Sequence, residues 1–278
     1  MDKYADIRKN ILEYANHDAD IKAVIAIGST TRTDVIADEF SDLDLIIATD
    51  DPKEWFTGEY TERLGNVSIS FVEPTLGGGK ERRTIYEEDK DVDMIIFTSD
   101  QFVNSLKTGV AQCVMNRGYD VIYDSGGFAE LIKQCINNEP LNPKTSKEEY
   151  LNLVNDFYFH NIWASKKLRR GEIWSSKMCV DAYLKNCLLK MMELYSFYQW
   201  GADVWHDGRF LDQWADDDVL EELKHCFAHY DKDDIRKALI ATHKLFDRIA
   251  KAVAEMLGYT YPLEAEKCAD RYIRMKSG

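Results

Sequence analysis

The segment between residues 24 and 47 constrains the fold more than any other part of the sequence. The apolar run Val24–Ile27 ends in Gly28 and Ser29, and a spacer of 12 residues (30–41) separates it from a second apolar run that opens with Asp42 and Asp44. Both runs have the composition of β-strands bounded by turn residues. Side chains alternate along a strand, so Asp42 and Asp44 are expected on one face. Two carboxylates this close repel each other unless a cation lies between them, and the segment therefore predicts two strands with a divalent metal site.

The residues around this pair predict a site for a triphosphate. Gly28 lets the backbone approach a phosphate closely, and Ser29 with the amides after it can donate hydrogen bonds to that phosphate. A third acidic segment begins at Asp91 and becomes apolar after Asp93, which is expected on a strand beside Asp42 and Asp44. Three carboxylates on two adjacent strands favour a two-metal site for phosphoryl transfer.

The first half of the chain is expected to be a mixed α/β domain. Runs rich in Val, Ile, Phe or Tyr predict strands at Ile21–Ile27, Leu43–Ala48, Val67–Val72, Val92–Phe97 and Tyr119–Tyr123. Amphipathic spacing predicts helices at Tyr4–Ala15, near Gln101–Lys107 and at Phe128–Ile136. Gly77-Gly78-Gly79-Lys80 lacks the spacing and the Ser/Thr of a phosphate loop and is interpreted as a flexible hairpin.

The second half is expected to be helical. Asn137–Lys144 contains two prolines and three asparagines and predicts a linker. Ser146 and Glu149 form the pattern of a capping box. Helices are predicted at Lys147–Arg169, Ser175–Tyr198, Asp217–His229, Asp233–Leu257 and Glu264–Met275. The predicted class is α+β, with a mixed sheet and flanking helices in residues 1–138 and an all-α bundle in residues 145–278.

Composition limits the partners that the chain can have. The formal net charge is −14, so a nucleic-acid partner is disfavoured and a cationic small molecule would be attracted. No apolar run reaches the length of a membrane span, and the first ten residues do not form a secretory signal, so we expect a cytoplasmic protein without a membrane partner. None of the 6 cysteines forms a Cys-x-x-Cys pair, which argues against a zinc ribbon or a redox pair.

These motifs resemble the nucleotidyltransferase superfamily, and more closely its aminoglycoside 6-adenylyltransferase (streptomycin adenylyltransferase) family. Phe40–Asp44 and Val92–Met94 are similar to the family's acidic strand motifs. Looser matches extend through the helical half, at Asp156-Phe157, Lys166, Leu168, Arg170, Glu172, Lys177, Asp181, Leu189–Met191, Tyr195 and Phe246–Pro262. The sequence departs from the family in two places: Thr30 and Thr31 precede Arg32 where the family usually has Arg directly after Gly-Ser, and Phe71–Asp89 matches poorly.

The resemblance implies a nucleotidyltransferase fold followed by a helical domain. It also implies Mg²⁺ and ATP, with AMP transferred to a hydroxyl of an aminoglycoside such as streptomycin and pyrophosphate released. Asp42 and Asp44 would then bind the metals, and Asp93 would either complete the metal site or take the proton of the attacking hydroxyl.

The other site residues are assigned to this expected reaction. The nucleotide would be held by Gly28, Ser29, Arg32, Ser41, Lys177 and Lys185, with Lys177 as the cation from the helical domain and Lys185 two helical turns after it. Asp181 lies one helical turn after Lys177 and is either a second candidate base or the partner of that lysine. A cationic acceptor needs carboxylates, for which the candidates are Glu87, Glu88, Asp89, Glu172 and Asp181.

Several alternatives remain open. A lincosamide or another small molecule is an alternative acceptor, and a module that binds a nucleotide without catalysis is an alternative to an enzyme. A metal-dependent phosphohydrolase could use the same carboxylates with water, although Gly28 and Ser29 favour a triphosphate. His225 and His229 have the i, i+4 spacing of a helical zinc site but lack the accompanying Glu of a metalloprotease. The aromatic residues Phe157, Tyr158, Phe159, Trp163 and Trp174 are interpreted mainly as bundle core, and the alternative is that one of the rings stacks on adenine or borders the acceptor.

Overall fold

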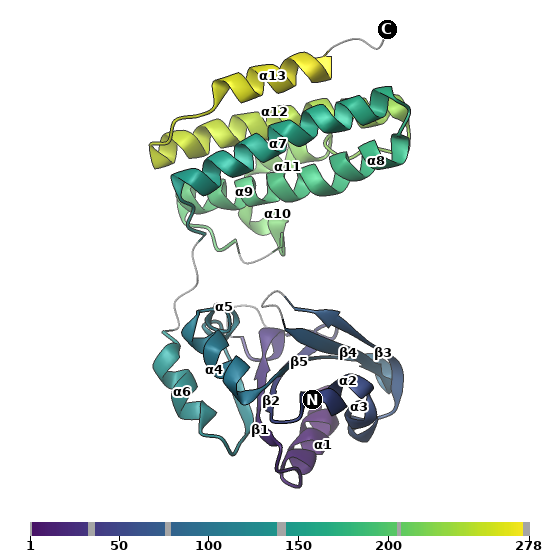
Figure 1. Ribbon diagram of the computed structural model, residues 1–278, viewed down its shortest axis with the longest axis vertical. Coiled ribbons are helices and arrows are strands. Elements are labelled where there is room, and N and C mark those ends of the chain that lie inside the picture. The colour runs from purple at the N-terminus through teal and green to yellow at the C-terminus, as the bar shows by residue number, and fades with distance from the viewer. Residues whose placement is uncertain (1, 33–36, 76–78, 138–142, 205–206, 275–278) are drawn as a thin grey trace. The chain divides into compact units, whose positions relative to one another are not determined.

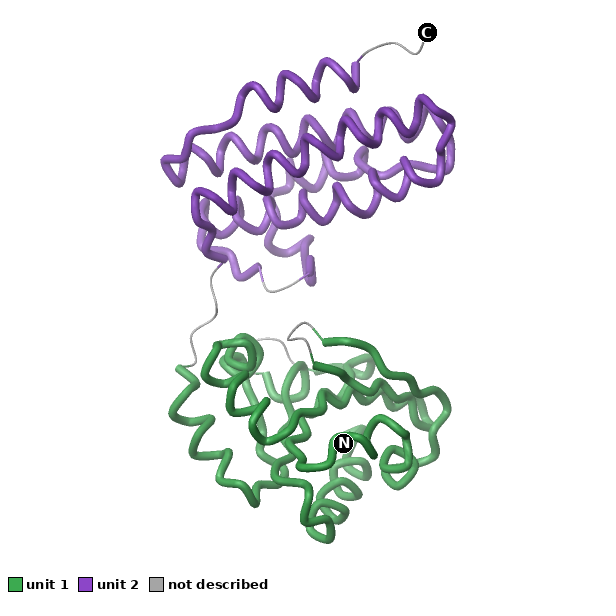
Figure 2. Tube along the Cα trace, in the orientation of Figure 1, with its two compact units in different colours: residues 1–141 green, residues 142–278 purple. Residues whose placement is uncertain are grey.

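The chain forms two compact units. A computed structural model describes residues 2–32, 37–75, 79–137, 143–204 and 207–274. Unit 1 comprises residues 1–141 and unit 2 comprises residues 142–278 (Figure 2). Among the described residues, none of the helices combines the length and the apolar character that a membrane span requires.

Parts of three predicted segments lie outside the described residues. These parts are residues 138–142 of the predicted linker, Gly77 and Gly78 of the predicted hairpin, and Met275 at the end of the last predicted helix.

Unit 1 is built on one mixed sheet of six strands (Figure 1). Strands β2 and β5 are parallel, and every other neighbouring pair is antiparallel. The order across the sheet is β3 (Val67–Pro74), β4 (Lys80–Tyr86), β5 (Lys90–Phe97), β2 (Leu43–Thr49), β1 (Ile21–Ile27) and β6 (Asp120–Asp124). The two strands predicted around the Gly-Ser and Asp-x-Asp motifs are therefore neighbours within the sheet.

Helices cover both faces of this sheet (Figure 1). Side chains of alternate positions in β1 enter different cores, with Val24 and Ala26 on one face and Ile25 and Ile27 on the other. A strand buried on both faces is apolar throughout, which explains the continuous run in this part of the sequence. The first face packs on α1 (Ala5–Ala15), α2 (Pro52–Thr57) and α3 (Glu59–Leu64), and the second on α4 (Ser99–Lys107), α5 (Gln112–Met115) and α6 (Phe128–Cys135).

Strand β4 and the short helices α2, α3 and α5 are not among the elements predicted from the sequence. Strand β4 was not predicted because its first four residues are charged, unlike the apolar runs that indicate strands. Arg82 nevertheless lies inside, 7% exposed, because its guanidinium donates hydrogen bonds to the carbonyls of Trp55 (2.7 Å) and Phe56 and to the hydroxyl of Ser70. Hydrogen bonding of this kind allows a charged side chain to be buried.

Unit 2 is a bundle of helices, so the predicted α+β class with a C-terminal helical region is confirmed. The capping box of Ser146 and Glu149 opens the first long helix as predicted. The helices are α7 (Lys147–Arg169), α8 (Ile173–Met178), α9 (Leu184–Trp200), α10 (Leu211–Trp214), α11 (Asp217–Leu223), α12 (Lys232–Leu257) and α13 (Leu263–Arg274).

Aromatic side chains from α7 and α12 form the centre of the bundle. Phe157 and Phe246 are fully buried and stack with ring centroids 3.6 Å apart. Tyr150, also on α7, is buried and donates a hydrogen bond to the carbonyl of Ala250 at 2.7 Å. The interpretation of the aromatic cluster as core is wrong for Phe159 and Trp174, which are 64% and 69% exposed.

Two predicted helices differ from the observed ones. The predicted helix Ser175–Tyr198 is interrupted by a π-helical turn, Cys179–Tyr183, where the ammonium of Lys185 donates to the carbonyl of Val180 at 2.8 Å and to the hydroxyl of Thr242 at 2.7 Å. The predicted helix Asp217–His229 ends at Leu223. Tertiary contacts such as those of Lys185 can override a local helical pattern.

The early end of α11 removes the geometric basis for a zinc site. His225 and His229 lie after the helix, so they do not share a helical face. The ring of His229 instead contacts the carboxylate of Asp234 at 2.9 Å, next to the start of α12.

Phe157→Ala is expected to lower the free energy of unfolding of unit 2 by about 3–5 kcal/mol, because it leaves a cavity in a close-packed aromatic stack. Phe159→Ala is a matched control two residues away on the same helix, where the exposed ring predicts a change below about 0.5 kcal/mol. Urea unfolding followed by far-UV circular dichroism measures both. Equal losses in the two variants would contradict the core described above.

Candidate active site

The register of three central strands brings two acidic residues together. Ile27, the last residue of β1, is paired with Asp44 on β2, and Asp44 is paired with Asp93 on the parallel strand β5. The side chains of paired residues in neighbouring strands extend to the same face of the sheet. Asp44 and Asp93 are therefore adjacent, as the sequence predicted.

Asp42 completes a cluster of three carboxylates. Oxygen atoms of Asp42, Asp44 and Asp93 all lie within 4.8 Å of one another. Within the described part of the chain, these residues are the one group of three or more acidic, histidine or cysteine side chains with this spacing. Carboxylate oxygens are the ligands preferred by hard divalent cations such as Mg²⁺, so the donor set fits the metal that the sequence implied.

Asp93 is the most deeply buried member of the cluster. It is 5% exposed, and its Oδ1 atom is buried without a hydrogen-bond partner among the described residues. Burial raises the pKa of this carboxyl to about 7, and the nearby Arg83 guanidinium lowers it only in part. A buried oxygen left without a donor costs free energy, and a bound cation would remove that cost.

Gly28 is fitted to the carboxylate of Asp44. Its φ angle is +71°, and a Cβ atom at this position would lie 1.9 Å from Oδ2 of Asp44. Both the backbone conformation and the space therefore require glycine. The hydroxyl of Ser29, the next residue in the 3₁₀ turn Gly28–Thr30, donates to the carbonyl of Asp42 at 3.3 Å. The turn is thus held directly against both acidic residues of the Asp-x-Asp motif.

Arg83 is a site residue that the sequence analysis missed. It lies on β4 opposite Asp93, and its guanidinium contacts Oδ2 of Asp93 at 3.4 Å. The same guanidinium binds Glu73 at 2.6 Å and Glu81 at 2.9 Å. The alternation of Glu81 and Arg83 was a possible signal, but only the strand register shows that they face Asp93.

Tyr4, which lies outside the motifs, positions the loop before Asp42. The hydroxyl of this buried side chain donates to the carbonyl of Ser41 at 2.7 Å. The Ser41 hydroxyl itself closes a turn by donating to Asp38 at 3.0 Å. Local sequence patterns carry no signal for Tyr4, because it acts through a contact 37 residues away along the chain.

Gly118 supports the backbone on the other side of the 3₁₀ turn. A Cβ atom on Gly118 would lie 2.3 Å from the carbonyl oxygen of Thr31 and 3.3 Å from the Cα atom of Arg32. Glycine at position 118 therefore leaves room for the backbone of Thr31 and of Arg32, a predicted nucleotide ligand, and no local pattern singles this glycine out.

The acceptor candidates Glu88 and Asp89 lie in a turn between β4 and β5. Glu88 contacts Lys90 at 3.0 Å. Lys90 precedes Asp93 by three residues on β5, which corresponds to roughly 10 Å along a strand. These two acids are therefore more distant from the carboxylate cluster than the sequence analysis implied.

Other acids lie nearer to the cluster. Glu73 and Glu81 are joined to Asp93 by the guanidinium of Arg83. The third candidate of the turn, Glu87, accepts a hydrogen bond from Asn66 at 2.9 Å instead.

The predicted residues of unit 2 form contacts within that unit. Lys177 binds Asp181 and the carbonyl of Ala228, and Glu172 binds Lys167 at 2.6 Å. Asp181 is consequently the partner of Lys177 in this structure, which was one of the two roles left open for it.

Lys185 lies inside the bundle. It is 9% exposed, and burial lowers its pKa to about 8. Its ammonium is engaged by the carbonyl of Val180 and the hydroxyl of Thr242, so the structure gives it a role within unit 2.

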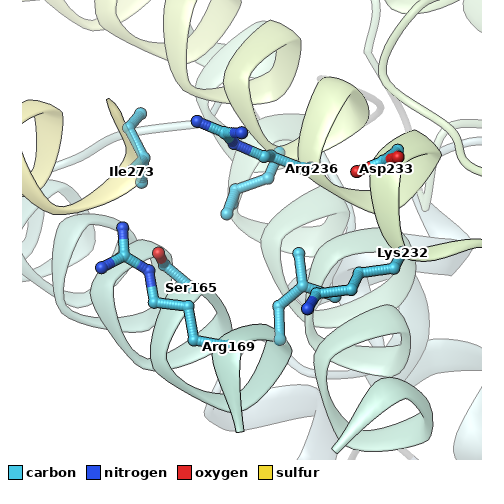
Figure 3. A pocket seen from close by; sticks show the side chains of 8 residues that line it. Ser165, Arg169, Lys232, Asp233, Arg236 and Ile273 are labelled. Atoms are coloured by element: carbon cyan, nitrogen blue, oxygen red, sulfur yellow. The ribbon is translucent and has the colours of Figure 1, made fainter. Parts of the chain in front are cut away.

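A small pocket in unit 2 contains none of the predicted site residues. Figure 3 shows Arg169, Arg236 and Lys232 around it, together with Asp233. Its volume is about 30 Å³. Three cationic groups and this small size make the pocket unsuitable for a cationic acceptor.

Comparisons with known proteins agree with the motifs. The family model described as streptomycin adenylyltransferase matches residues 1–275. A curated aminoglycoside 6-adenylyltransferase of Bacillus subtilis (strain 168) is 22% identical over 265 residues, which cover 90% of each chain.

Two solved structures also match the chain. An aminoglycoside 6-adenyltransferase from Bacillus subtilis has 19% identity and a TM-score of 0.46, with 96% of this chain and 95% of that chain covered. A nucleotidyltransferase-like protein from Exiguobacterium sibiricum has 16% identity and a TM-score of 0.35, with 91% and 77% covered. Because the family model spans nearly the whole sequence, the chain belongs to the streptomycin adenylyltransferase family and is an enzyme of the nucleotidyltransferase type.

Proposed function

We propose that this enzyme uses Mg²⁺ to transfer AMP from ATP to a hydroxyl of an aminoglycoside, with release of pyrophosphate. The observation that carries this proposal is the cluster of Asp42, Asp44 and Asp93 against the Gly28–Thr30 turn. The cluster fits divalent cations, and the backbone of the adjoining turn would receive phosphate oxygens. Membership of the family supports the same reaction.

The reaction exchanges one phosphorus–oxygen bond for another. The acceptor hydroxyl oxygen forms a bond to the α-phosphorus, while the bond from that phosphorus to the pyrophosphate oxygen breaks. The hydroxyl proton would leave to solvent water, or to Asp93 where that carboxylate does not ligate a cation. Bound Mg²⁺ would supply charge neutralisation for the phosphate oxygens. Asp42 and Asp44 would hold the cations, and Gly28 and Ser29 would orient the triphosphate. The contribution of the protein is then mainly positioning and electrostatic stabilisation.

Asp93 is assigned to the metal site in this proposal. Its Oδ1 atom, which no described side chain satisfies, lies in the same cluster as the carboxylates of Asp42 and Asp44. The proton of the attacking hydroxyl would pass to Asp93 only if its carboxylate were not ligating a cation. In that case its burial, which raises the pKa of this carboxyl, would favour its acceptance of the proton.

The surroundings of the cluster support a cationic acceptor. Glu73 and Glu81 reach toward the site from the β3–β4 pair, where Arg83 joins them to Asp93. Burial raises the pKa of Glu81, which means that its charged form is poorly solvated. A cationic group of the acceptor, in addition to the guanidinium of Arg83, would therefore be favourable beside it. The net charge of −14 also attracts cationic molecules to the protein as a whole.

An acceptor screen tests the proposed reaction. Pyrophosphate release from ATP and Mg²⁺ is expected with streptomycin or another aminoglycoside, and mass spectrometry should find the acceptor heavier by one AMP group. Lincomycin is included because a lincosamide is the alternative acceptor for the same chemistry. Release with lincomycin alone, or with water alone, would contradict the aminoglycoside assignment.

Asp44→Asn should abolish turnover with little change in stability, because it removes half of the carboxylate pair in the Asp-x-Asp motif but keeps the shape of the side chain. We expect at least about a 100-fold loss, on the order of 3 kcal/mol of transition-state stabilisation. Asp100→Asn, at an exposed position in α4, is the control for a lost charge. Full activity of Asp44→Asn would refute the metal-binding role.

Gly28→Ala should reduce both metal affinity and turnover, because the new methyl group would occupy the position of the Asp44 carboxylate. The positive φ angle adds a strain of roughly 1 kcal/mol. Gly127→Ala in unit 1 is the matched control, since its φ angle is +76° but nothing lies within 4 Å of the added Cβ. Mn²⁺ titration and steady-state kinetics measure the effect. If both variants bind Mn²⁺ equally, the contact of Gly28 with Asp44 has no role in metal binding.

A further inference from the structure

Arg8 lies beside the turn that the proposed function assigns to the triphosphate. Its Nη2 atom donates a hydrogen bond to the hydroxyl of Thr30 at 3.1 Å, and Thr30 is the last residue of the 3₁₀ turn Gly28–Thr30. Arg8 is on α1, which is fixed to the sheet by the buried side chains of Ile7 and Ile11. The guanidinium is thereby held at one place relative to the turn.

The other contacts of Arg8 with described residues leave much of its hydrogen-bonding capacity unused. Its Nε atom is buried and lies 3.4 Å from Oδ2 of Asp2, an ion pair that does not meet the geometry of a hydrogen bond, and its Nη1 atom lies 3.7 Å from Oδ2 of Asp120. These acidic side chains are 50% and 67% exposed. Ion pairs with exposed partners contribute little to stability. A guanidinium has five N–H donors, so it can keep these contacts and still donate to a ligand.

The charges of the proposed reaction create a need for this group. Three carboxylates and a triphosphate together carry more negative charge than two divalent cations neutralise. Phosphoryl-transfer sites meet this excess with arginine or lysine side chains that contact the phosphates. Arg83 lies on the Asp93 side of the cluster, where it is shared with Glu73 and Glu81. Arg8 reaches the turn at the β1 side, from α1, which packs on the face of the sheet opposite to the carboxylate cluster.

We propose that Arg8 is a phosphate-binding residue, which contacts the triphosphate of the nucleotide at the Gly28–Thr30 turn while Thr30 orients its guanidinium. This inference rests on the proposed function, because it assumes that the turn receives a triphosphate. A planar guanidinium suits this task, since it can bind two phosphate oxygens at once. Arg8 lies in none of the sequence motifs of the site, so its role follows from the packing of α1 rather than from local sequence.

The alternative is that Arg8 has only a structural role, in which its ion pairs with Asp2 and Asp120 stabilise the position of α1. The two roles differ in the effect of removing an acid. If Arg8 binds phosphate, Asp120→Asn takes away a competing anion, and phosphate affinity should stay equal or rise. If Arg8 has only the structural role, Asp120→Asn and Arg8→Gln should lower the phosphate affinity to a similar extent, because both would act by destabilising the fold.

The experiment measures binding of inorganic tripolyphosphate in the presence of Mg²⁺ by isothermal titration calorimetry, with the full chain and no acceptor. Arg8→Gln should weaken binding about tenfold or more, as expected for a lost charge-assisted hydrogen bond. Arg8→Lys should retain part of the affinity, because it keeps the charge without the planar fork. Lys9→Gln, the exposed neighbour on α1, is the control for a lost positive charge and should bind like the wild type.

The outcomes separate the inference from the proposed function. Equal tripolyphosphate binding by Arg8→Gln and the wild type would overturn the role of Arg8 while leaving the proposed function intact. A loss of tripolyphosphate affinity in Asp120→Asn as large as that in Arg8→Gln would also overturn the role of Arg8, in favour of the structural role. A wild type that binds neither Mg²⁺-tripolyphosphate nor Mg²⁺-ATP would overturn both. Circular dichroism melting of each variant shows whether a lost affinity comes from unfolding.

Discussion

The parallel pairing of β2 with β5 is the constraint on which the site depends. It places Asp44 directly beside Asp93, so the sheet forces two carboxylates together at a position where one of them is buried. The free energy for this unfavourable arrangement comes from the apolar residues that follow on both strands, which fill the cores on the two faces of the sheet. A slip of one residue in this pairing would turn Asp93 to the other face. The packing of the strands therefore determines the geometry of the acidic cluster.

The same packing explains why glycine and small polar residues surround the cluster. Gly28 follows the strand residue paired with Asp44, and only a residue without Cβ leaves room for the Asp44 carboxylate. Ser29 then binds back to the backbone of Asp42. Tyr4 fixes the adjoining loop through the carbonyl of Ser41. Each of these contacts limits the movement of Asp42 and Asp44, and rigid placement of charged groups is what electrostatic catalysis requires.

The sequence predicted those parts of the site that local patterns determine. Strand β1, strand β2 and the acidic cluster were predictable because long apolar runs and closely spaced carboxylates can be recognised within a short stretch of sequence. Arg83 was not, because its strand begins with charged residues and its contact with Asp93 is set by the register of β4 on β5. The assignment of Lys185 to the nucleotide rests on helical spacing. Such spacing identifies residues that share a face but does not show whether that face is inside the bundle, where Lys185 lies.

The order of the strands places different groups on the two sides of the proposed site. Glu73, Glu81 and Arg83 lie on β3 and β4, the carboxylate cluster lies at β5 and β2, and the Gly28–Thr30 turn with Arg8 lies at the β1 side. An acceptor attracted by carboxylates would thus approach from the β4 side, and a triphosphate attracted by Arg8 and the turn would lie on the β1 side. In-line displacement requires the attacking hydroxyl and the leaving pyrophosphate on opposite sides of the α-phosphorus. The proposed places of the acceptor on the β4 side and of the triphosphate on the β1 side agree with this requirement.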